Sequence, residues 1–201
     1  SVTELVTVDK TRPSIELNLD KVVAELLPGS EKNQEVINKV LDAGRLMLSA
    51  DSVGAAQIML DKAVAYSLER KQFGRVIGSF QAVKHMCAEM AAELEPCHSM
   101  IWYAAHCYDH DPSQARLMAC HTKAHVSEVG KQISKTSTEV HGGMGFTDEL
   151  GLHYWFKRIG LNRQLLGSPE LVREEAARIQ NFDQSPAEGQ GNKEVGNPLL
   201  V

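Results

Sequence analysis

Residues 111–143, DPSQARLMACHTKAHVSEVGKQISKTSTEVHGG, contain the strongest structural pattern in the chain. Asp111 followed by proline is typical of a helix start, because the carboxylate can accept from free backbone N–H groups and proline fits the first helical position. Small or apolar side chains then recur every three or four residues, close to a heptad seam, until the glycines at 142–143 break the pattern. The stretch therefore predicts a long helix whose narrow buried face consists of Thr122, Val126, Val129, Ile133, Thr136 and Val140.

Helical periodicity extends in both directions from this segment. We expect helices at about 33–72, 79–108 and 147–163, and a last helix that opens at Ser168-Pro169. Phe73-Gly74 is expected to end the first of them, and Thr147 to cap the fourth. Five helices with short connections favour an all-α, antiparallel bundle. The first helix is expected to bury Val36, Val40, Met47, Ile58, Ala65 and Leu68, and the second Phe80, Val83, Cys87, Met90, Leu94, Cys97 and Ile101.

The first thirty residues follow a different pattern. VTELVTV (2–8) and SIELNL (14–19) contain alternating apolar residues, which predict two strands. Two strands alone are marginal, so we expect them to be the end of a larger β-domain. The last segment is rich in Gly, Asn and Pro and is expected to be flexible. The predicted domains are thus a β-domain end at 1–30, a helical bundle at 31–182 and a tail at 183–201.

Composition narrows the class of protein. Of 201 residues, 43% are hydrophobic and 23% are charged, and the formal net charge is −5. This balance argues against nucleic acid as a partner, because phosphate binding needs a clustered excess of Lys and Arg. No stretch approaches the roughly 20 apolar residues that span a bilayer, and the N-terminus does not resemble a secretory signal. We therefore expect a cytoplasmic protein with no membrane partner.

The segment LERKQFGRVIGSFQAVKHM, residues 68–86, is the first candidate site. It places Arg70 at a helix end, a Phe73-Gly74 turn, and Phe80-Gln81 at the next helix start. A guanidinium can bind a diphosphate through two hydrogen bonds, and backbone amides at a helix start face an anion. A solvated arginine in a basic turn explains the segment equally well. Both interpretations stay open on these residues alone.

A second candidate is TEVHGGMGFTDE, residues 138–149, where Gly142 and Gly143 would let the backbone approach a ligand closely. An ordinary turn between helices is the more common explanation of such glycines. His121 and His125 share one helical face with the spacing of a metal pair. Zinc needs three or four ligands, and no nearby residue completes the set, so we predict no metal site.

Three segments together resemble motifs of the acyl-CoA dehydrogenase family of flavoproteins, over about residues 5–180. In that family the first segment contacts the flavin pyrophosphate and the flavin itself. The second resembles the family's QxHGGxGxT, which contacts the adenosine half of FAD across a subunit interface, although Glu139 replaces the glutamine here. The third, QLLGSPELVRE at 164–174, resembles YEGTxEIxR. The resemblance implies an FAD site formed by Arg70, Phe73, Phe80, Gln81, Glu139, Gly142, Gly143, Ser168 and Glu170.

The same resemblance implies that the catalytic base is missing. The family removes the α proton of an acyl-CoA thioester with a carboxylate, and such a base contributes about 10²–10⁴-fold. Leu166 stands at the position of that glutamate. Some members place the base on the first long helix, where LDAGRLMLSA (41–50) has Gly44. Asp42 is the nearest carboxylate, and it lies one position away from the expected face.

The chain thus resembles the C-terminal helical domain of a noncatalytic subunit from a heteromeric, actinobacterial acyl-CoA dehydrogenase. We expect it to contribute FAD binding and assembly, as a homo- or hetero-oligomeric dimer or tetramer, to the α,β-dehydrogenation of a fatty or steroid side-chain acyl-CoA in the bacterial cytoplasm. An electron-transfer flavoprotein is the expected acceptor. Because the family's upstream segments are missing, we expect no complete enzyme. Two alternatives remain: a cofactor-free helical interaction module, and an active enzyme whose base is Asp42 or lies upstream.

Overall fold

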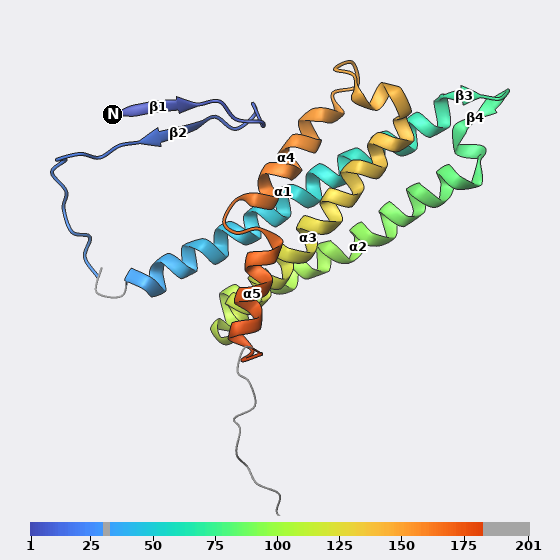
Figure 1. Ribbon diagram of the computed structural model, residues 1–201. Helices are drawn as coiled ribbons and strands as arrows, with labels where there is room; N and C mark the ends of the chain where they lie inside the picture. The colour runs from blue at the N-terminus through green and yellow to red at the C-terminus, as the bar shows by residue number, and fades with distance from the viewer. Residues whose placement is uncertain (30–32, 183–201) are drawn as a thin grey trace, which may run out of the picture.

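The protein is an antiparallel bundle of helices preceded by a two-stranded arm (Figure 1). The computed structural model describes residues 1–29 and 33–182. The predicted all-α class with a short β segment in front is confirmed. In chain order the elements are β1 (Val2–Leu5), β2 (Ser14–Leu17), α1 (Asn33–Glu69), β3 (Lys71–Gln72), β4 (Arg75–Val76), η2 (Ile77–Ser79), α2 (Gln81–His110), α3 (Pro112–His141), η3 (Gly142–Phe146), α4 (Leu152–Gln164) and α5 (Pro169–Ile179).

Helix α3 is the centre of the bundle, and it contacts α1, α2, α4 and α5. All six positions of its predicted seam are buried, which confirms that prediction. Small polar side chains let neighbouring helices come close: the Ser137 hydroxyl donates to the Met59 carbonyl oxygen of α1 at 2.7 Å. The predicted face of α2 is also confirmed, because Met90, Leu94 and Cys97 belong to the core. The core further includes Val53, Ala56, Met59, Ala63, Val126, Val129, Ile133, Leu152 and Ile159.

The buried face predicted for α1 is wrong. Val36, Val40, Met47 and Leu68 are between 55% and 71% exposed, and Ile58 and Ala65 are exposed as well. The face that packs into the bundle lies on the opposite side of the helix and uses Ala56, Met59 and Ala63. Helix α1 therefore has two apolar faces with the same helical period, and periodicity alone does not tell which face is inside.

The end of α1 also differs from the prediction. The helix stops at Glu69, and a two-residue hairpin, β3–β4, follows in place of its last turn. Phe73 and Gly74 are the turn of this hairpin, with φ of 52° and 77°, the positive values that a tight two-residue hairpin requires. They therefore do not terminate the helix. Helix α2 begins two residues later than expected, since Ile77–Ser79 form a 3-10 turn.

Two of the three predicted helix caps are confirmed. The Asp111 side chain accepts from the Ser113 N–H at 3.2 Å, and Ser168 accepts from the Leu171 N–H at 3.5 Å. Thr147 does not cap α4. Its hydroxyl donates back to the Met144 carbonyl oxygen at 2.8 Å, and α4 begins only after Gly151, which takes a left-handed conformation.

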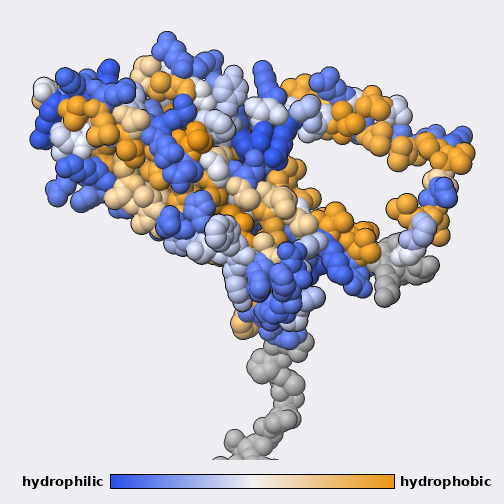
Figure 2. All heavy atoms as spheres, turned by 180° about the vertical axis from the view of Figure 1, so that it is seen from behind, coloured by the Kyte–Doolittle hydropathy of each residue, from blue (hydrophilic) through white to orange (hydrophobic). Residues whose placement is uncertain are grey.

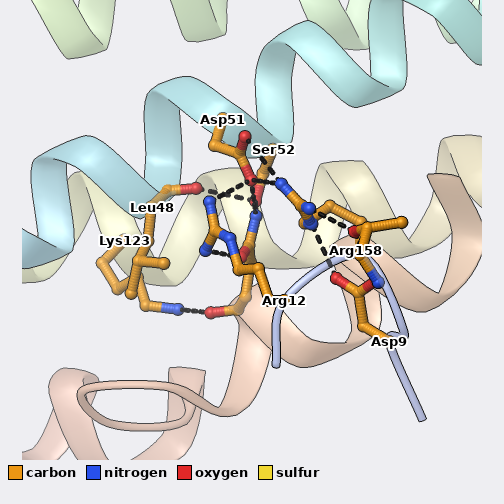
Figure 3. Close-up of polar contacts among 9 residues, drawn as sticks. Asp9, Arg12, Leu48, Asp51, Ser52, Lys123 and Arg158 are labelled. Atoms are coloured by element: carbon orange, nitrogen blue, oxygen red, sulfur yellow. Dashed lines mark hydrogen bonds and ion pairs between the residues drawn. The ribbon is translucent and has the colours of Figure 1, made fainter. Parts of the chain in front are cut away.

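The β1–β2 arm projects from the bundle and is fixed to it through its connecting loop. Arg158 of α4 donates to Asp9 at 2.6 Å, and Arg12 donates to Asp51 of α1 at 3.1 Å (Figure 3). Asp9 is buried, and hydrogen bonds from Thr11 and Arg158 lower its pKa although burial opposes them. The arm is therefore held by polar contacts at one point of the bundle.

The strands of the arm are open to solvent on both faces. Seen from behind, apolar side chains lie along much of the arm, and open space separates it from the nearby part of the bundle (Figure 2). The exposed apolar residues here include Leu17, Leu19, Val23, Leu26 and Leu27. The predicted boundary between 30 and 31, like the predicted tail at 183–201, lies outside the described residues. Across residues 1–29 and 33–182, no helix is long and apolar enough to cross a membrane.

Candidate functional site

A pocket of about 400 Å³ lies where α1, the β3–β4 hairpin and the end of α3 meet. Arg70 and the Gly142-Gly143 pair line it together, so two segments that are far apart in the sequence form one site. The backbone of Arg70 is fixed on both sides: its N–H donates to the Tyr66 carbonyl at 2.9 Å, and its carbonyl accepts from the Ile77 N–H at 2.8 Å. This Arg70 pocket is lined by Tyr66, Arg70, Gln72, Ile77, Val140, His141, Gly142, Gly143 and Met144.

The Arg70 side chain is exposed. Within the part of the chain that the structure describes, its guanidinium has no hydrogen-bond or ion-pair partner. An arginine fork is well suited to a phosphate or diphosphate group, because its parallel N–H groups match two anionic oxygens. The pocket can therefore hold an anion at its arginine end.

The three glycines of the loop, at positions 142, 143 and 145, differ in whether the fold requires a glycine there. Gly142 ends α3 with φ 59° and ψ −139°, a conformation that essentially only glycine adopts. A Cβ on Gly145 would lie 2.6 Å from the Thr138 carbonyl oxygen, so packing requires that glycine. A Cβ on Gly143 would meet no atom within 4 Å, and its φ is not positive. The fold of the chain thus does not explain Gly143, which leaves room beside the pocket for a ligand.

The floor of the pocket is an aromatic pair. The rings of Tyr66 and His141 lie 4.6 Å apart between centroids. His141 is buried, and its Nδ1 donates to the Ser137 carbonyl oxygen at 2.7 Å. Burial lowers the pKa of His141, which favours the neutral form of the ring. The lining of the pocket therefore combines this tilted aromatic pair with the cation of Arg70.

Four other predicted cofactor residues lie near the pocket without lining it. Phe73, at the hairpin tip, is 91% exposed, and its ring packs edge-on against Phe80 at 6.1 Å. Arg75 lies over the Phe80 ring, 4.0 Å from its centre. Gln81 and Glu139 are exposed, at the start of α2 and in the last turn of α3. Positive φ is uncommon for phenylalanine, and at Phe73 the tight hairpin turn requires it.

The third motif forms a separate site at the loop between α4 and α5. Leu166 has φ 58° and Gly167 has φ 110°. Leucine in this region is strained by roughly 1–2 kcal/mol. The Leu166 side chain covers Gly44 of α1: a Cβ on that glycine would overlap Leu166 Cδ1. The two positions that the sequence resemblance assigns to the base therefore lie next to each other.

Arg45 anchors this loop from inside the bundle. It is 6% exposed, and its Nε donates to the Leu166 carbonyl oxygen at 3.0 Å. Its remaining nitrogens contact Glu175 at 2.8 Å and Asp42 at 3.3 Å. Although burial opposes it, the hydrogen bond from Arg45 lowers the pKa of Glu175. All edges of the Arg45 guanidinium are thus engaged.

Asp42 lies in this ionic cluster. Burial raises the pKa of Asp42, although Arg116 and Arg45 act in the opposite direction. It lines a groove with Tyr108 and Arg116 at the start of α3, which is distinct from the Leu166 loop. A buried carboxylate paired with Arg45 is poorly placed to receive a proton from a ligand beside Leu166.

Ser168 and Glu170, the remaining predicted contacts, begin α5. Ser168 caps the helix. Glu170 is exposed and pairs with Arg163 at 2.8 Å. The Ser168 hydroxyl and Arg163 lower the pKa of Glu170 to about 2. Both residues have structural roles at the helix start.

The two sites lie far apart. Gly44 and Arg70 are separated by 26 positions along α1, which corresponds to about 39 Å at 1.5 Å per residue. The structure thus groups Arg70, Gly142 and Gly143 at one end of α1, and Leu166 with Ser168 near the other.

Several residues of these sites were not predicted. Tyr66, Gln72, Ile77 and Met144 complete the Arg70 pocket, and their types carry no chemical signal on their own. Arg45 could have been suspected, because it stands three residues after Asp42, and the two charged residues interrupt the apolar run LDAGRLML. Its partner Glu175 is 130 residues away, and no local pattern connects them.

Comparison with known proteins identifies the family of this chain. Residues 34–180 match the family model "Acyl-CoA dehydrogenase, C-terminal domain". The chain is 30% identical over 169 residues to the acyl-CoA dehydrogenase IpdE2 of Mycolicibacterium smegmatis, which covers 84% of this chain and 51% of that protein. The chain thus spans about half the length, or less, of the curated relatives it matches.

Solved structures give the same result. A glutaryl-coenzyme A dehydrogenase in complex with glutaryl-CoA superposes with a TM-score of 0.84 and 26% identity, over 92% of this chain and 48% of that one. The steroid ACAD Tcur3481-Tcur3483 superposes with a TM-score of 0.81 and 25% identity, over 91% and 49%. Together with the matched residues 34–180, these findings show that the chain belongs to the acyl-CoA dehydrogenase family and contains its C-terminal helical domain.

Proposed function

We propose that this chain contributes an FAD-binding and assembly surface to an acyl-CoA dehydrogenase, and that its own site has no catalytic base. One observation carries the proposal: Arg70 and the Gly142-Gly143 pair, which the sequence separates by about seventy positions, line one pocket. The cationic rim suits a diphosphate, and the space beside Gly143 suits the close approach of a nucleotide.

Residues of this chain fit the cofactor in complementary ways. Arg70 would bind the pyrophosphate, while Gly142 and Gly143 would face the adenosine half. Phe73, Phe80 and Gln81 would contact the cofactor from the hairpin side, with Glu139 at the rim. The chemistry that FAD supplies in such an enzyme is acceptance of a hydride from the β carbon of the acyl group. The role of the Arg70 pocket would be to bind the cofactor and to orient it.

The separation of the two sites supports an assembly of more than one chain. About 39 Å along α1 exceeds the length of one extended flavin dinucleotide. A cofactor held by the Arg70 pocket therefore cannot also reach Leu166 and Ser168 of the same chain. The flavin ring would then lie against another polypeptide, in a homo- or hetero-oligomeric dimer or tetramer.

The Leu166 loop supports the silent-site part of the proposal. Leucine cannot accept a proton, Gly44 carries no side chain, and the Asp42 carboxylate is paired with Arg45. The oxidation would thus take place in the partner's site. By analogy with the steroid ACAD named above, a bulky acyl-CoA such as a steroid side-chain thioester is the proposed substrate. An electron-transfer flavoprotein is the proposed acceptor.

The test compares Arg70→Ala with Lys71→Ala in the assembled complex. Lys71 is an exposed cation one residue away that does not line the pocket. Bound flavin per chain is measured by visible absorption, and native mass is measured on the same samples. We expect loss of flavin only in Arg70→Ala, with the native mass unchanged. Equal flavin content in both variants would contradict the cofactor role.

The exposed face of α1 favours a second candidate, a helical interaction module without cofactor. Val36, Val40, Met47 and Leu68 form an apolar stripe that the described residues leave uncovered. Such a stripe is typical of a surface that packs against another chain. A colourless but oligomeric complex would support this alternative over the first proposal.

A further inference from the structure

Asn162, in the last turn of α4, connects the loop of the β1–β2 arm to the bundle through its side chain. The residue is fully buried, and its amide nitrogen donates to Asp51 at 2.6 Å and to the Ser52 hydroxyl at 3.2 Å, both on α1. Its Oδ1 accepts from Arg12 of the arm loop at 3.1 Å. Arg12 also donates to Asp51 at 3.1 Å (Figure 3). Among the described residues, Arg12 is the only donor to the Asn162 side-chain oxygen.

The backbone of the same turn is held from the other side of the bundle. Lys123 of α3 donates to the Asn162 carbonyl oxygen, and also to the Arg163 carbonyl oxygen at 3.3 Å. Four residues after Asn162, the Leu166 carbonyl oxygen accepts from Arg45 of α1 at 3.0 Å. The last turn of α4 and the Leu166 loop are thus held by donors from α1 and α3. Within the part of the chain that the structure describes, the arm contacts this turn only through Asn162.

Release of the arm loop would leave the Asn162 side-chain oxygen buried without a donor. Such an oxygen is costly, so the last turn of α4 has to move until the oxygen reaches water. The Leu166 loop follows this turn directly in the chain and has to move with it. We propose that Asn162 couples the seating of the arm loop to the order of the Leu166 loop. The coupling concerns contacts within this chain, and it does not depend on the function proposed above.

The test is hydrogen exchange of the purified chain, measured by mass spectrometry on peptides that cover residues 161–168. In Arg12→Ala these peptides should exchange several-fold faster than in the wild type. Lys10→Ala is the matched control, because Lys10 is an exposed cation of the same loop with no hydrogen bond or ion pair among the described residues. Peptides from α2 should exchange as in the wild type in both variants. Wild-type exchange of residues 161–168 in Arg12→Ala, or an equal acceleration in α2, would overturn the inference.

Two further variants test whether Asn162 is the connection. Asn162→Leu removes the oxygen at similar side-chain size, so adding Arg12→Ala to it should not accelerate exchange of residues 161–168 further. An equal fold-change of Arg12→Ala in both backgrounds would overturn the role of Asn162.

The reverse direction can be measured with Asn162 in place, because coupling between two sites is reciprocal. Lys123→Met removes the donor to the Asn162 backbone and leaves the contacts of the arm loop intact. Trypsin should then cut after Lys10 several-fold faster, whereas Lys135→Met, at an exposed position of the same helix, should leave the rate unchanged. Equal cleavage rates in the two variants would overturn the coupling.

Discussion

Lys123 in the middle of α3 should make the stability of this protein rise in alkaline solution. The residue is only 1% exposed. Its Nζ, which Figure 3 shows with one dashed contact, donates to the carbonyl oxygen of Asn162 near the end of α4. It also donates to the Arg163 carbonyl oxygen at 3.3 Å and to the Ser127 hydroxyl at 3.3 Å. No carboxylate among the described residues pairs with it. Burial, with smaller effects from Arg45 and Arg163, lowers the pKa of Lys123 from 10.5 to about 8.

The lowered pKa fixes the sign and size of the effect. Between pH 8 and 10.5 the unfolded chain holds the proton and the folded chain has lost it, so the free energy of unfolding rises with pH. Below pH 8 both states are charged, and the folded protein bears the full cost of the buried ammonium. At about 1.4 kcal/mol per pH unit, the rise amounts to roughly 3 kcal/mol, as an order of magnitude.

The assay is urea unfolding by circular dichroism at several pH values, for the wild type and for Lys123→Met. We expect the wild type to gain roughly 3 kcal/mol relative to the variant as the pH rises from 8 to 10.5. Near pH 7 the free energies of unfolding of the wild type and of Lys123→Met should lie close together, because two effects oppose each other. Methionine removes the cost of the buried charge, but it leaves the carbonyl oxygens at the end of α4 without their donor, which costs about 1–3 kcal/mol. Lys135→Met, at an exposed position of the same helix, is the control and should run parallel to the wild type. A constant gap between wild type and Lys123→Met across this range would refute the reasoning.

Two further predictions concern the loop and the arm. Gly145→Ala should destabilise the chain by about 1–3 kcal/mol, because its Cβ would meet the Thr138 carbonyl oxygen at 2.6 Å. Gly143→Ala should keep the wild-type unfolding midpoint and lower the flavin content of the complex, because a Cβ there meets no atom within 4 Å. A lower unfolding midpoint for Gly143→Ala than for Gly145→Ala would contradict the packing argument. Arg158→Ala should loosen the β1–β2 arm, because it removes the contact with Asp9 and leaves the arm loop held by Arg12. Limited proteolysis should then cut within residues 6–13 several-fold faster while the bundle stays intact. An unchanged cleavage rate in Arg158→Ala would argue against this anchor. The contact between Arg158 and Asp9 should also weaken in acid. The lowered pKa of Asp9 stabilises the folded state above pH 3.8, and this contribution is lost as the pH falls through the pKa of Asp9 in the folded protein.

The central helix could be predicted from sequence because several local signals agree there. Asp111 and the proline after it mark the start of α3, the seam from Thr122 to Val140 has one period, and Gly142 marks the end. Each of these is a short-range property of the chain. The start of α5 at Ser168 followed for the same reason.

The β3–β4 hairpin could not be predicted in this way. Its strands are two residues long, which is too short for an alternating pattern, and Phe73 at φ 52° is not a residue that signals such a turn. The contacts of buried polar side chains could not be predicted from the sequence either. Lys123 reads as a solvated helix residue, and only the fold places it beside the end of α4.

The candidate site was half predictable, and α1 explains why. Motif residues identify Arg70 and the glycine loop, but a motif does not say which residues belong to one ligand. The Leu166 loop and the Arg70 pocket stand about 39 Å apart along α1, and Met47 and Leu68 of the outer stripe are exposed between them. A helix that is apolar on opposite sides is stable in water only when both sides are covered. The function proposed above requires a second chain against this one, and the outer stripe of α1 is an apolar surface on which such a chain could pack.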